Sequence, residues 1–340
     1  MSLDLPFIWA GIIALAVLMY VLLDGFDLGI GILFPFATPK ERDVMMESVA
    51  PIWDGNETWL VLGGAGMLAA FPFAYGALMP ALYGPILIML LALILRGVAF
   101  EFRHHGRARG KAFWTAGFIV GSIAATLAQG LALGGFIQGV TLQGKAFAGG
   151  PLDWLTPYSA LVAVGLVAGY ALLGATWIVW RTEGDLQAKA RRWAWIAIAA
   201  TALLLAAVSL ATLLVHPRVA ARWGFEGGVF DVARLLRLTP IPLVGLAGLL
   251  LAAWGLRRRH HVTPFLGTYL VFFSGYLGLA VGFFPNIVPY AMTYRQAANA
   301  DNALALMLVG VSILLPAILG YTVWVYWLFR GKVGGDAGYH

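Results

Sequence analysis

Long apolar runs recur along the whole chain and are separated by short polar stretches. A helix needs about 20 apolar residues to cross roughly 30 Å of hydrocarbon. On that criterion the pattern predicts an all-α polytopic membrane protein with nine spans, at 7–36, 53–71, 77–100, 113–138, 157–180, 193–215, 239–256, 262–284 and 303–329. The longest gap, 216–238, is too short for a soluble domain, so residues 1–340 are expected to form a single integral membrane domain.

The composition excludes other broad classes. Hydrophobic residues make up 61% of the chain and charged residues only 11%, with a mean hydropathy of +0.84, whereas soluble domains average about 25% charged residues. The absence of cysteine excludes disulfides and thiolate-bound metal centres within this chain. The net charge of +6 comes from basic residues in short loops, where they set membrane topology, so we predict no nucleic-acid partner.

Basic residues are distributed unequally between alternate gaps. One set of gaps, which includes the segment after the last span, contains 15 lysines and arginines, and the other contains 6. Because the richer set normally faces the cytoplasm, we expect the N-terminus outside and the C-terminus in the cytoplasm. Four arginines in 216–238 run against this rule. That segment, with Arg222, Glu226, Asp231 and Arg234, is alternatively a surface helix that touches a partner.

Ionisable residues gather at one depth of the predicted bundle. Such residues are costly inside a membrane and usually face the bundle interior or a wet path. Seven lie near the side assigned to the cytoplasm, on or just after the first three spans: Asp24, Asp27, Asp54, Glu57, Arg96, Glu101 and Arg103. Within each pair, Asp24 with Asp27 and Asp54 with Glu57, the spacing of three places both acids on one helical face.

This convergence predicts a proton intake path in which Arg96 neutralises one carboxylate and the others pass protons. Two structural alternatives remain open. Buried charge pairs also serve only to lock helices together, and Asp54 and Glu57 lie where a helix N-terminus favours acids.

Glycine and tryptophan give further expectations. Gly25, Gly29 and Gly31 in the first span, and Gly63, Gly64 and Gly66 in the second, would let helix backbones approach closely. Trp53 and Trp59 flank the acids of the second span and are candidates for a subunit interface. Other aromatic residues near span ends, Tyr326 among them, fit an interfacial belt.

The six histidines are His104, His105, His216, His260, His261 and His340, and none lies inside a predicted span. A haem within the bilayer takes an axial His, Met, Cys or Tyr. We therefore expect this chain to ligate no haem and no metal, so that any redox cofactor belongs to a partner.

Several motifs resemble those of one family. The stretches LLDGFDLGIG (22–31), APIWDGNETWLVLGGAGMLAAFP (50–72) and LRGVAFEFR (95–103) resemble the N-terminal signature of cytochrome bd-type quinol oxidase subunit II. GFFPNIVPY (282–290) and LPAILGYTVWVYWLFRGKV (315–333) resemble its C-terminal signature. The TYRQAANAD segment (293–301) favours the cyanide-insensitive branch, because many members have an aromatic-acidic string there instead.

The resemblance implies a fold, a complex and a reaction. It implies two four-helix bundles plus one peripheral helix, paired with a subunit I that carries b-type haems, a d-type haem or its b-type replacement, and the quinol site. The complex would oxidise quinol and reduce dioxygen to water in the bacterial inner membrane, with protons taken from the cytoplasm. Asp54 matches the acid of the family's WDG string, and Glu101 matches an acid after the third helix. A structural quinone and a small single-helix accessory subunit are also compatible with the resemblance.

Two other functions remain as alternatives. A proton-coupled secondary transporter would also use buried acids and broken helices, but it should show an internal repeat and charges at the midplane. A purely structural assembly subunit would use the acids only in salt bridges.

Overall fold

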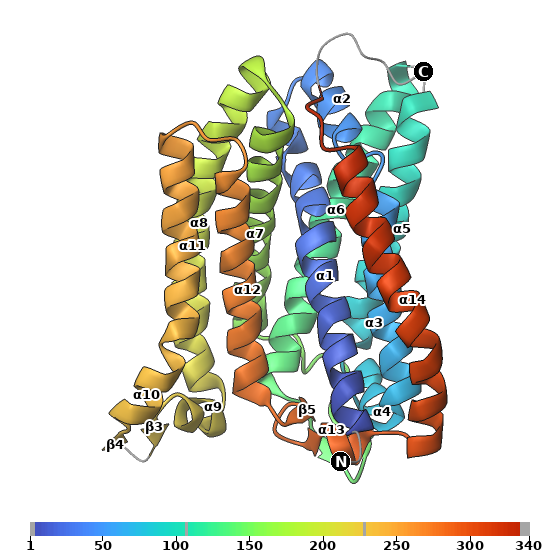
Figure 1. The fold of residues 1–340 in the computed structure, drawn as a ribbon, viewed down its shortest axis with the longest axis vertical. Helices are drawn as coiled ribbons and strands as arrows, with labels where there is room; N and C mark the ends of the chain where they lie inside the picture. The colour runs from blue at the N-terminus through green and yellow to red at the C-terminus, as the bar shows by residue number, and fades with distance from the viewer. Residues whose placement is uncertain (1–3, 106–107, 227–228, 334–340) are drawn as a thin grey trace.

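The computed structural model describes residues 4–105, 108–226 and 229–333, which are almost entirely helical and run along one common axis (Figure 1). The long helices are α1 (Leu5–Leu33), α3 (Trp53–Ala70), α5 (Tyr83–His105), α6 (Ala108–Gln138), α7 (Pro157–Arg181), α8 (Gly184–Val215), α11 (Pro240–Arg257), α12 (Thr263–Phe283) and α14 (Asp301–Leu328). Short helices connect them: η1 (Phe34–Phe36), α2 (Pro39–Glu47), α4 (Pro72–Ala81), α9 (Pro217–Arg222), α10 (Val232–Leu238) and α13 (Tyr294–Ala297). Three antiparallel strand pairs lie in the loops: β1 (Leu142–Gln143) with β2 (Ala146–Phe147), β3 (Phe225–Glu226) with β4 (Val229–Phe230), and β5 (Asn286–Val288) with β6 (Met292–Thr293).

The predicted spans correspond one to one with the nine long helices of the described chain. Eight of them are long and apolar enough to cross a bilayer, and α3 is the less apolar ninth because Asp54 and Glu57 lie in its first turns. Two boundaries were wrong. The sixth span was predicted to begin at 193, but α8 begins at Gly184. The third span was predicted to begin at 77, but α4 ends at Ala81 and α5 begins at Tyr83, where Pro85 fits the first turn of a new helix.

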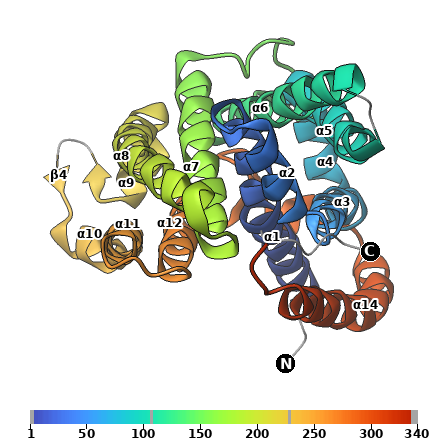
Figure 2. The same ribbon diagram turned by 90° about the horizontal axis from the view of Figure 1, so that it is seen from above.

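The long helices form two groups of four with one helix outside. Helices α1, α3, α5 and α6 make the first bundle, α7, α8, α11 and α12 make the second, and α14 lies against the outside of the first (Figures 1 and 2). The expected arrangement of two four-helix bundles and a peripheral helix is confirmed. Helices α1 and α7 pack together where the two bundles meet.

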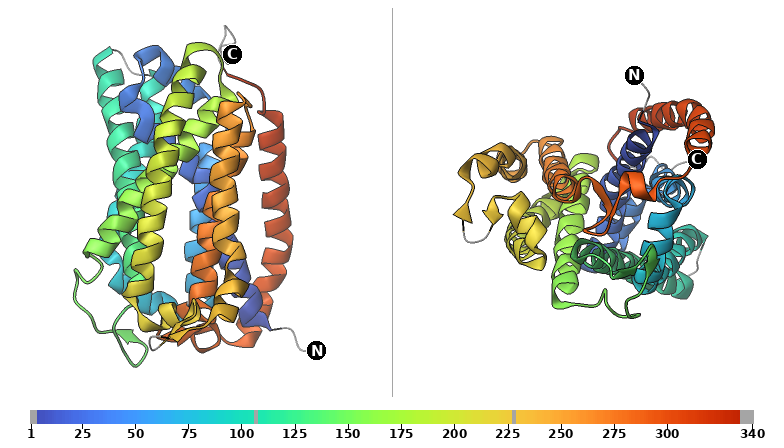
Figure 3. Two further views of the ribbon diagram at one scale, coloured as in Figure 1. Left: turned by 90° about the vertical axis from the view of Figure 1, so that its left-hand side faces the viewer. Right: turned by 90° about the horizontal axis from the view of Figure 1, so that it is seen from below.

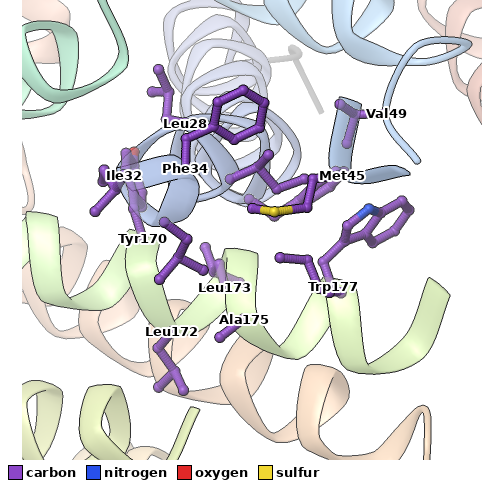
Figure 4. Close-up of a cluster of buried hydrophobic side chains, with 14 of the residues drawn as sticks. Leu28, Ile32, Phe34, Met45, Val49, Tyr170, Leu172, Leu173, Ala175 and Trp177 are labelled. Carbon is purple, nitrogen blue, oxygen red and sulfur yellow. The ribbon is translucent and has the colours of Figure 1, made fainter. Parts of the chain in front are cut away.

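The contact between α1 and α7 is so close that it requires glycine. A Cβ atom on Gly29 would stand 1.9 Å from the carbonyl oxygen of Tyr170, and one on Gly174 would stand 2.5 Å from the carbonyl carbon of Gly29. Side chains of both helices and of α2 fill the space beside this contact, including Leu28, Met45, Leu173 and Trp177 (Figure 4). The expected close approach is confirmed for α1, whereas a Cβ on Gly64 of α3 would meet nothing within 4 Å.

Replacing Gly29 with alanine is expected to prevent normal assembly, because the new methyl group would overlap backbone rather than a movable side chain. Overpacking a close-packed interior costs about 1–3 kcal/mol or more. The amount of intact protein recovered from membranes and its thermal denaturation measure the effect. Gly11→Ala on the same helix is the control, since nothing lies within 4 Å of its Cβ position, and equal behaviour of the two variants would contradict the prediction.

Three of the four arginines of 216–238 donate hydrogen bonds to backbone carbonyls of the same chain. Arg222 Nε donates to the carbonyl of Val281 at 3.1 Å, near the end of α12, and its Nη2 donates to Phe284. Arg218 donates to the carbonyl of Tyr290 at 2.7 Å, and Arg234 donates to Ala221 at 2.8 Å. Carbonyls at a helix C-terminus and in loops need such donors. Local backbone capping therefore explains why three basic residues occur at the end of the molecule that is poor in basic residues.

Candidate functional site

The guanidinium of Arg96, on α5, lies among three carboxylates from two other helices. Its Nη1 is 2.8 Å from Asp24 Oδ1 and 2.5 Å from Glu57 Oε1, and its Nη2 is 3.8 Å from Asp27 Oδ2. The side chains of Arg96, Asp24 and Asp27 are at most 1% exposed, whereas Glu57 is 26% exposed. We call these four residues the acid cluster. Glu57 is its link to the protein surface.

Local sequence explains how the cluster is held. Asp24 and Asp27 are one turn apart on α1 and therefore face α3 and α5 together. Gly121 of α6 leaves room for the backbone of α5, because a Cβ there would be 2.9 Å from the amide nitrogen of Arg96. The Trp53 ring lies 5.9 Å from the Arg96 guanidinium, a separation suited to a cation–π contact.

An amide and a phenol extend the cluster to the peripheral helix. Asn56 Nδ2 donates to Asp27 Oδ2 at 2.8 Å and lies 3.3 Å from the carbonyl oxygen of Leu23. The hydroxyl of Tyr326, on α14, donates to Asn56 Oδ1 at 2.9 Å. The belt position predicted for Tyr326 was wrong, since its hydroxyl is used inside the protein. Asn56 was also missed, although a buried amide within a span is itself a signal.

A second polar chain continues from Asp24 toward α7. The hydroxyl of Tyr170 donates to Gln129 Oε1 at 2.8 Å, and Gln129 Nε2 in turn donates to the hydroxyl of Tyr20. Tyr20 is one turn from Asp24 on α1. Buried polar groups therefore connect α1, α6 and α7 beside the acid cluster.

The acid cluster has more acids than bases. Three carboxyl groups surround one guanidinium, and burying uncompensated charge costs several kcal/mol. Within the described chain, Asp24 Oδ2, Asp27 Oδ1 and Arg96 Nε have no hydrogen-bond partner. The cluster can therefore hold exchangeable protons, and each bound proton reduces the excess negative charge by one.

Three other predicted residues lie apart from the cluster. Asp54 is exposed in the first turn of α3, so it does not share the inward face of Glu57, and Glu101 is exposed near the end of α5. Trp59 is 1% exposed and packs within this chain, which argues against a subunit interface at that residue. Trp53 is half-buried and remains the candidate of the two.

A separate ionic group contains more bases than acids. Asp43 of α2 lies 2.8 Å from Arg103 Nη2 and 2.9 Å from Lys111 Nζ, and Arg103 also donates to Thr115 at 2.9 Å. Partial burial raises the pKa of Asp43, but hydrogen bonds from Lys111 and Arg103 outweigh burial and hold that pKa below its usual value. This group ties α2 to α5 and α6 and has no excess of acid to exchange.

The histidines with described side chains lie at helix ends. His216 stacks on Tyr290 with ring centroids 3.8 Å apart, His260 lies 3.2 Å from Thr263, and His261 lies 3.0 Å from Gln187. The side chains of His104, His105 and His340 lie outside the described part. Across the described residues, no three His, Asp or Glu side chains are grouped as metal ligands. These positions do not suit an axial haem ligand inside the bilayer.

Comparisons with known proteins agree with one another. The family model described as cytochrome bd terminal oxidase subunit II matches residues 5–329. The chain is 27% identical to the Escherichia coli K12 cytochrome bd-I ubiquinol oxidase subunit 2, covering 97% of this chain and 95% of that protein. It is 28% identical to the Bacillus subtilis cytochrome bd ubiquinol oxidase subunit 2, covering 96% of each.

The fold is also similar to a solved structure. The bd oxidase structure from Geobacillus thermodenitrificans matches with a TM-score of 0.74 and 15% identity, over 97% of this chain and 100% of the matched chain. These similarities do not separate the cyanide-insensitive branch from the rest. With a family match over nearly the whole length, the chain belongs to the cytochrome bd terminal oxidase subunit II family.

Proposed function

We propose that this chain is the non-haem subunit of a membrane quinol:O2 oxidoreductase and supplies protons to the oxygen chemistry of a haem-bearing subunit I. One observation carries the proposal: three carboxylates surround a single guanidinium in the membrane-spanning bundle, and only Glu57 among them reaches the surface. The E. coli and B. subtilis relatives, which are named as ubiquinol oxidase subunits, support the reaction. The haems, b-type with a d-type or its b-type replacement, would be held by subunit I.

The direction of proton entry follows from the distribution of charge. The gaps of the sequence that are rich in basic residues adjoin the α2 end of the molecule (Figure 1). Glu57 lies in the first turns of α3, which follows α2 in the chain. Under the positive-inside rule the α2 end is on the cytoplasmic side of the bacterial inner membrane. The N-terminus is then outside and the C-terminus is in the cytoplasm.

Asp54 and Glu57 would act in sequence along α3. Asp54 is exposed one turn before Glu57, and Thr58, Val61 and Leu68 continue an exposed face along the same helix. An exposed carboxylate on a membrane helix is costly against lipid, so we place subunit I against this face. Protons would pass from Asp54 to Glu57, and Asp24 and Asp27 would exchange them through their shared contact with Arg96.

Two alternatives make different predictions. A secondary transporter would place its charged site at the midplane between related repeats, whereas the acid cluster lies toward one end of α1. A purely structural role would use the same ion pairs as a lock between α1, α3 and α5. The two roles, holding the helices together and transferring protons, are distinguished only by variants that keep the fold and change proton exchange.

Replacing Asp54 with asparagine is expected to slow oxygen reduction while the haems remain bound, because the amide keeps the volume but cannot carry a proton. Oxygen consumption and the absorption spectrum should be measured on the complex purified through a tag on this chain. Asp185→Asn is the matched control, since Asp185 is an exposed acid in the first turn of α8 at the same end. Unchanged turnover of Asp54→Asn would favour the purely structural role. A stable complex without haem would contradict the proposal that the chain is part of a quinol oxidase.

A further inference from the structure

Large apolar side chains are exposed beyond the membrane-spanning helices, at the end of the second bundle. Val229 and Phe230 of β4 are 70% and 55% exposed, and Val232 and Leu236 of α10 are 57% and 65% exposed. We call these four residues the β4–α10 surface. Figure 3 shows the β3–β4 hairpin and α10 projecting at the edge of the bundle rather than folding beneath it. The surface therefore faces away from the protein core.

Helix α10 is amphipathic despite its short length. Val232 and Leu236 are four residues apart and share one side, whereas Arg234 and Arg237 are three apart and lie on the opposite side. The helix leads into α11 through Thr239, whose amide donates to the carbonyl of Leu235 at 2.9 Å. This separation of apolar and basic side chains is typical of a helix that lies at the boundary between water and an apolar phase.

Backbone contacts fix the orientation of this segment. Arg222 binds the end of α12 through the carbonyls of Val281 and Phe284. Arg234 binds the carbonyl of Ala221, and the amide of Asp231 donates to the carbonyl of Gly224 at 2.9 Å. These bonds use the polar groups on the protein side, so the apolar side chains are held outward.

The β4–α10 surface continues the lipid-facing surface of the second bundle. Leu214, in the last turn of α8, is 87% exposed, and Leu243 and Leu246 in the first turns of α11 are also exposed. Both helices qualify as membrane spans, so the bilayer must reach the level at which 216–238 begins and ends. Three of the four arginines in that segment bind backbone carbonyls, and the fourth, Arg237, is exposed, which favours contact with an anionic surface.

We propose that the β4–α10 surface inserts into the headgroup region of the bilayer and anchors the second bundle in anionic phospholipid. Val229, Phe230, Val232 and Leu236 reach the upper part of the acyl chains, and Arg237 lies at the level of the lipid phosphates. This role is independent of proton transfer. From the sequence, the segment 216–238 was alternatively expected to touch a protein partner. Insertion into lipid is a different explanation for the same segment.

Site-directed spin labelling of the intact complex tests the proposal. The chain has no cysteine, so Leu236→Cys, Arg237→Cys and Leu214→Cys each introduce one label site into it. The complexes are placed in nanodiscs of phosphatidylethanolamine and phosphatidylglycerol, and the unmodified complex corrects for cysteines in other subunits. Collisions with lipid-soluble oxygen and with a water-soluble nickel chelate are compared at each site.

The labels at 236 and 214 are expected to collide more often with oxygen than with the nickel chelate. The label at 237 is expected to collide more often with the nickel chelate than the label at 236 does. Equal nickel accessibility at 236 and 237 would overturn the proposal, because the surface would then lie in water. Low accessibility of 236 to both reagents would also overturn it, because a protein partner would then cover the surface. In parallel, Arg237→Gln is expected to reduce the gain in thermal stability that phosphatidylglycerol gives over neutral lipid, and an unchanged gain would contradict the headgroup contact.

Discussion

Replacing Arg96 with leucine is expected to abolish accumulation of the assembled complex. Arg96 is the only cation within 4 Å of Asp24, Asp27 and Glu57 in the described chain. Removing one partner from a buried ion pair costs about 3–5 kcal/mol, because the other charge stays buried without compensation. Two of these three carboxylates are completely buried. The yield of complex from membranes, followed through a tag on this chain and by haem absorbance, measures the loss.

Further variants separate charge from packing at this site. Adding Asp24→Asn and Asp27→Asn to Arg96→Leu removes the two fully buried uncompensated charges and leaves only the partly exposed Glu57. We expect the triple variant to recover part of the yield. Arg295→Leu is the surface comparison, since Arg295 pairs with Asp4 and is largely exposed, and exposed pairs contribute little to stability. Normal yield from the single Arg96→Leu variant would show that the ion pairs do not hold the helices together.

Replacing Glu57 with glutamine is expected to slow oxygen reduction strongly while leaving the complex intact. Glutamine keeps the shape of the side chain and can still accept a hydrogen bond from Arg96, but it cannot bind and release a proton. Loss of a positioned proton-transfer group typically lowers the rate by about 10²-fold or more. Steady-state oxygen consumption per haem measures the effect, and the absorption spectrum confirms that the haems are retained.

Two variants control for this result. Glu57→Asp keeps a carboxyl group on a shorter side chain and is expected to retain an intermediate rate. Glu183→Gln, at the start of α8, removes an exposed acid that pairs with Lys332 at 3.3 Å, and it should leave the rate unchanged. Full turnover in Glu57→Gln would mean that the acid cluster serves only to lock α1, α3 and α5.

The architecture could be predicted because membrane helices are long, apolar and continuous in sequence. Each predicted span has a long helix in the structure, and the depth at which Asp24, Asp27, Glu57 and Arg96 meet follows from counting residues along three helices. Their pairing follows because a buried arginine must lie near acids. None of these steps requires knowledge of how the helices pack.

Residues that depend on packing were harder to predict. Spacing placed Asp54 and Glu57 on one face, but the rotation of α3 against α1 turns only Glu57 toward Arg96. The bond from Tyr326 to Asn56 joins residues 270 positions apart, so no local pattern indicates it. Trp59 was predicted to lie at a subunit interface. A tryptophan within a span does not indicate by itself whether it faces lipid, a partner or its own chain.

The most direct test of proton supply through the acid cluster is a single turnover of the purified complex. The fully reduced enzyme is mixed rapidly with oxygen, and haem absorbance is followed together with a pH-indicator dye that reports proton uptake. We expect Glu57→Gln and Asp54→Asn to delay proton uptake and the haem transitions that require it, with initial oxygen binding unchanged. Proton uptake at the unmodified rate in both variants, with haems intact, would contradict the account.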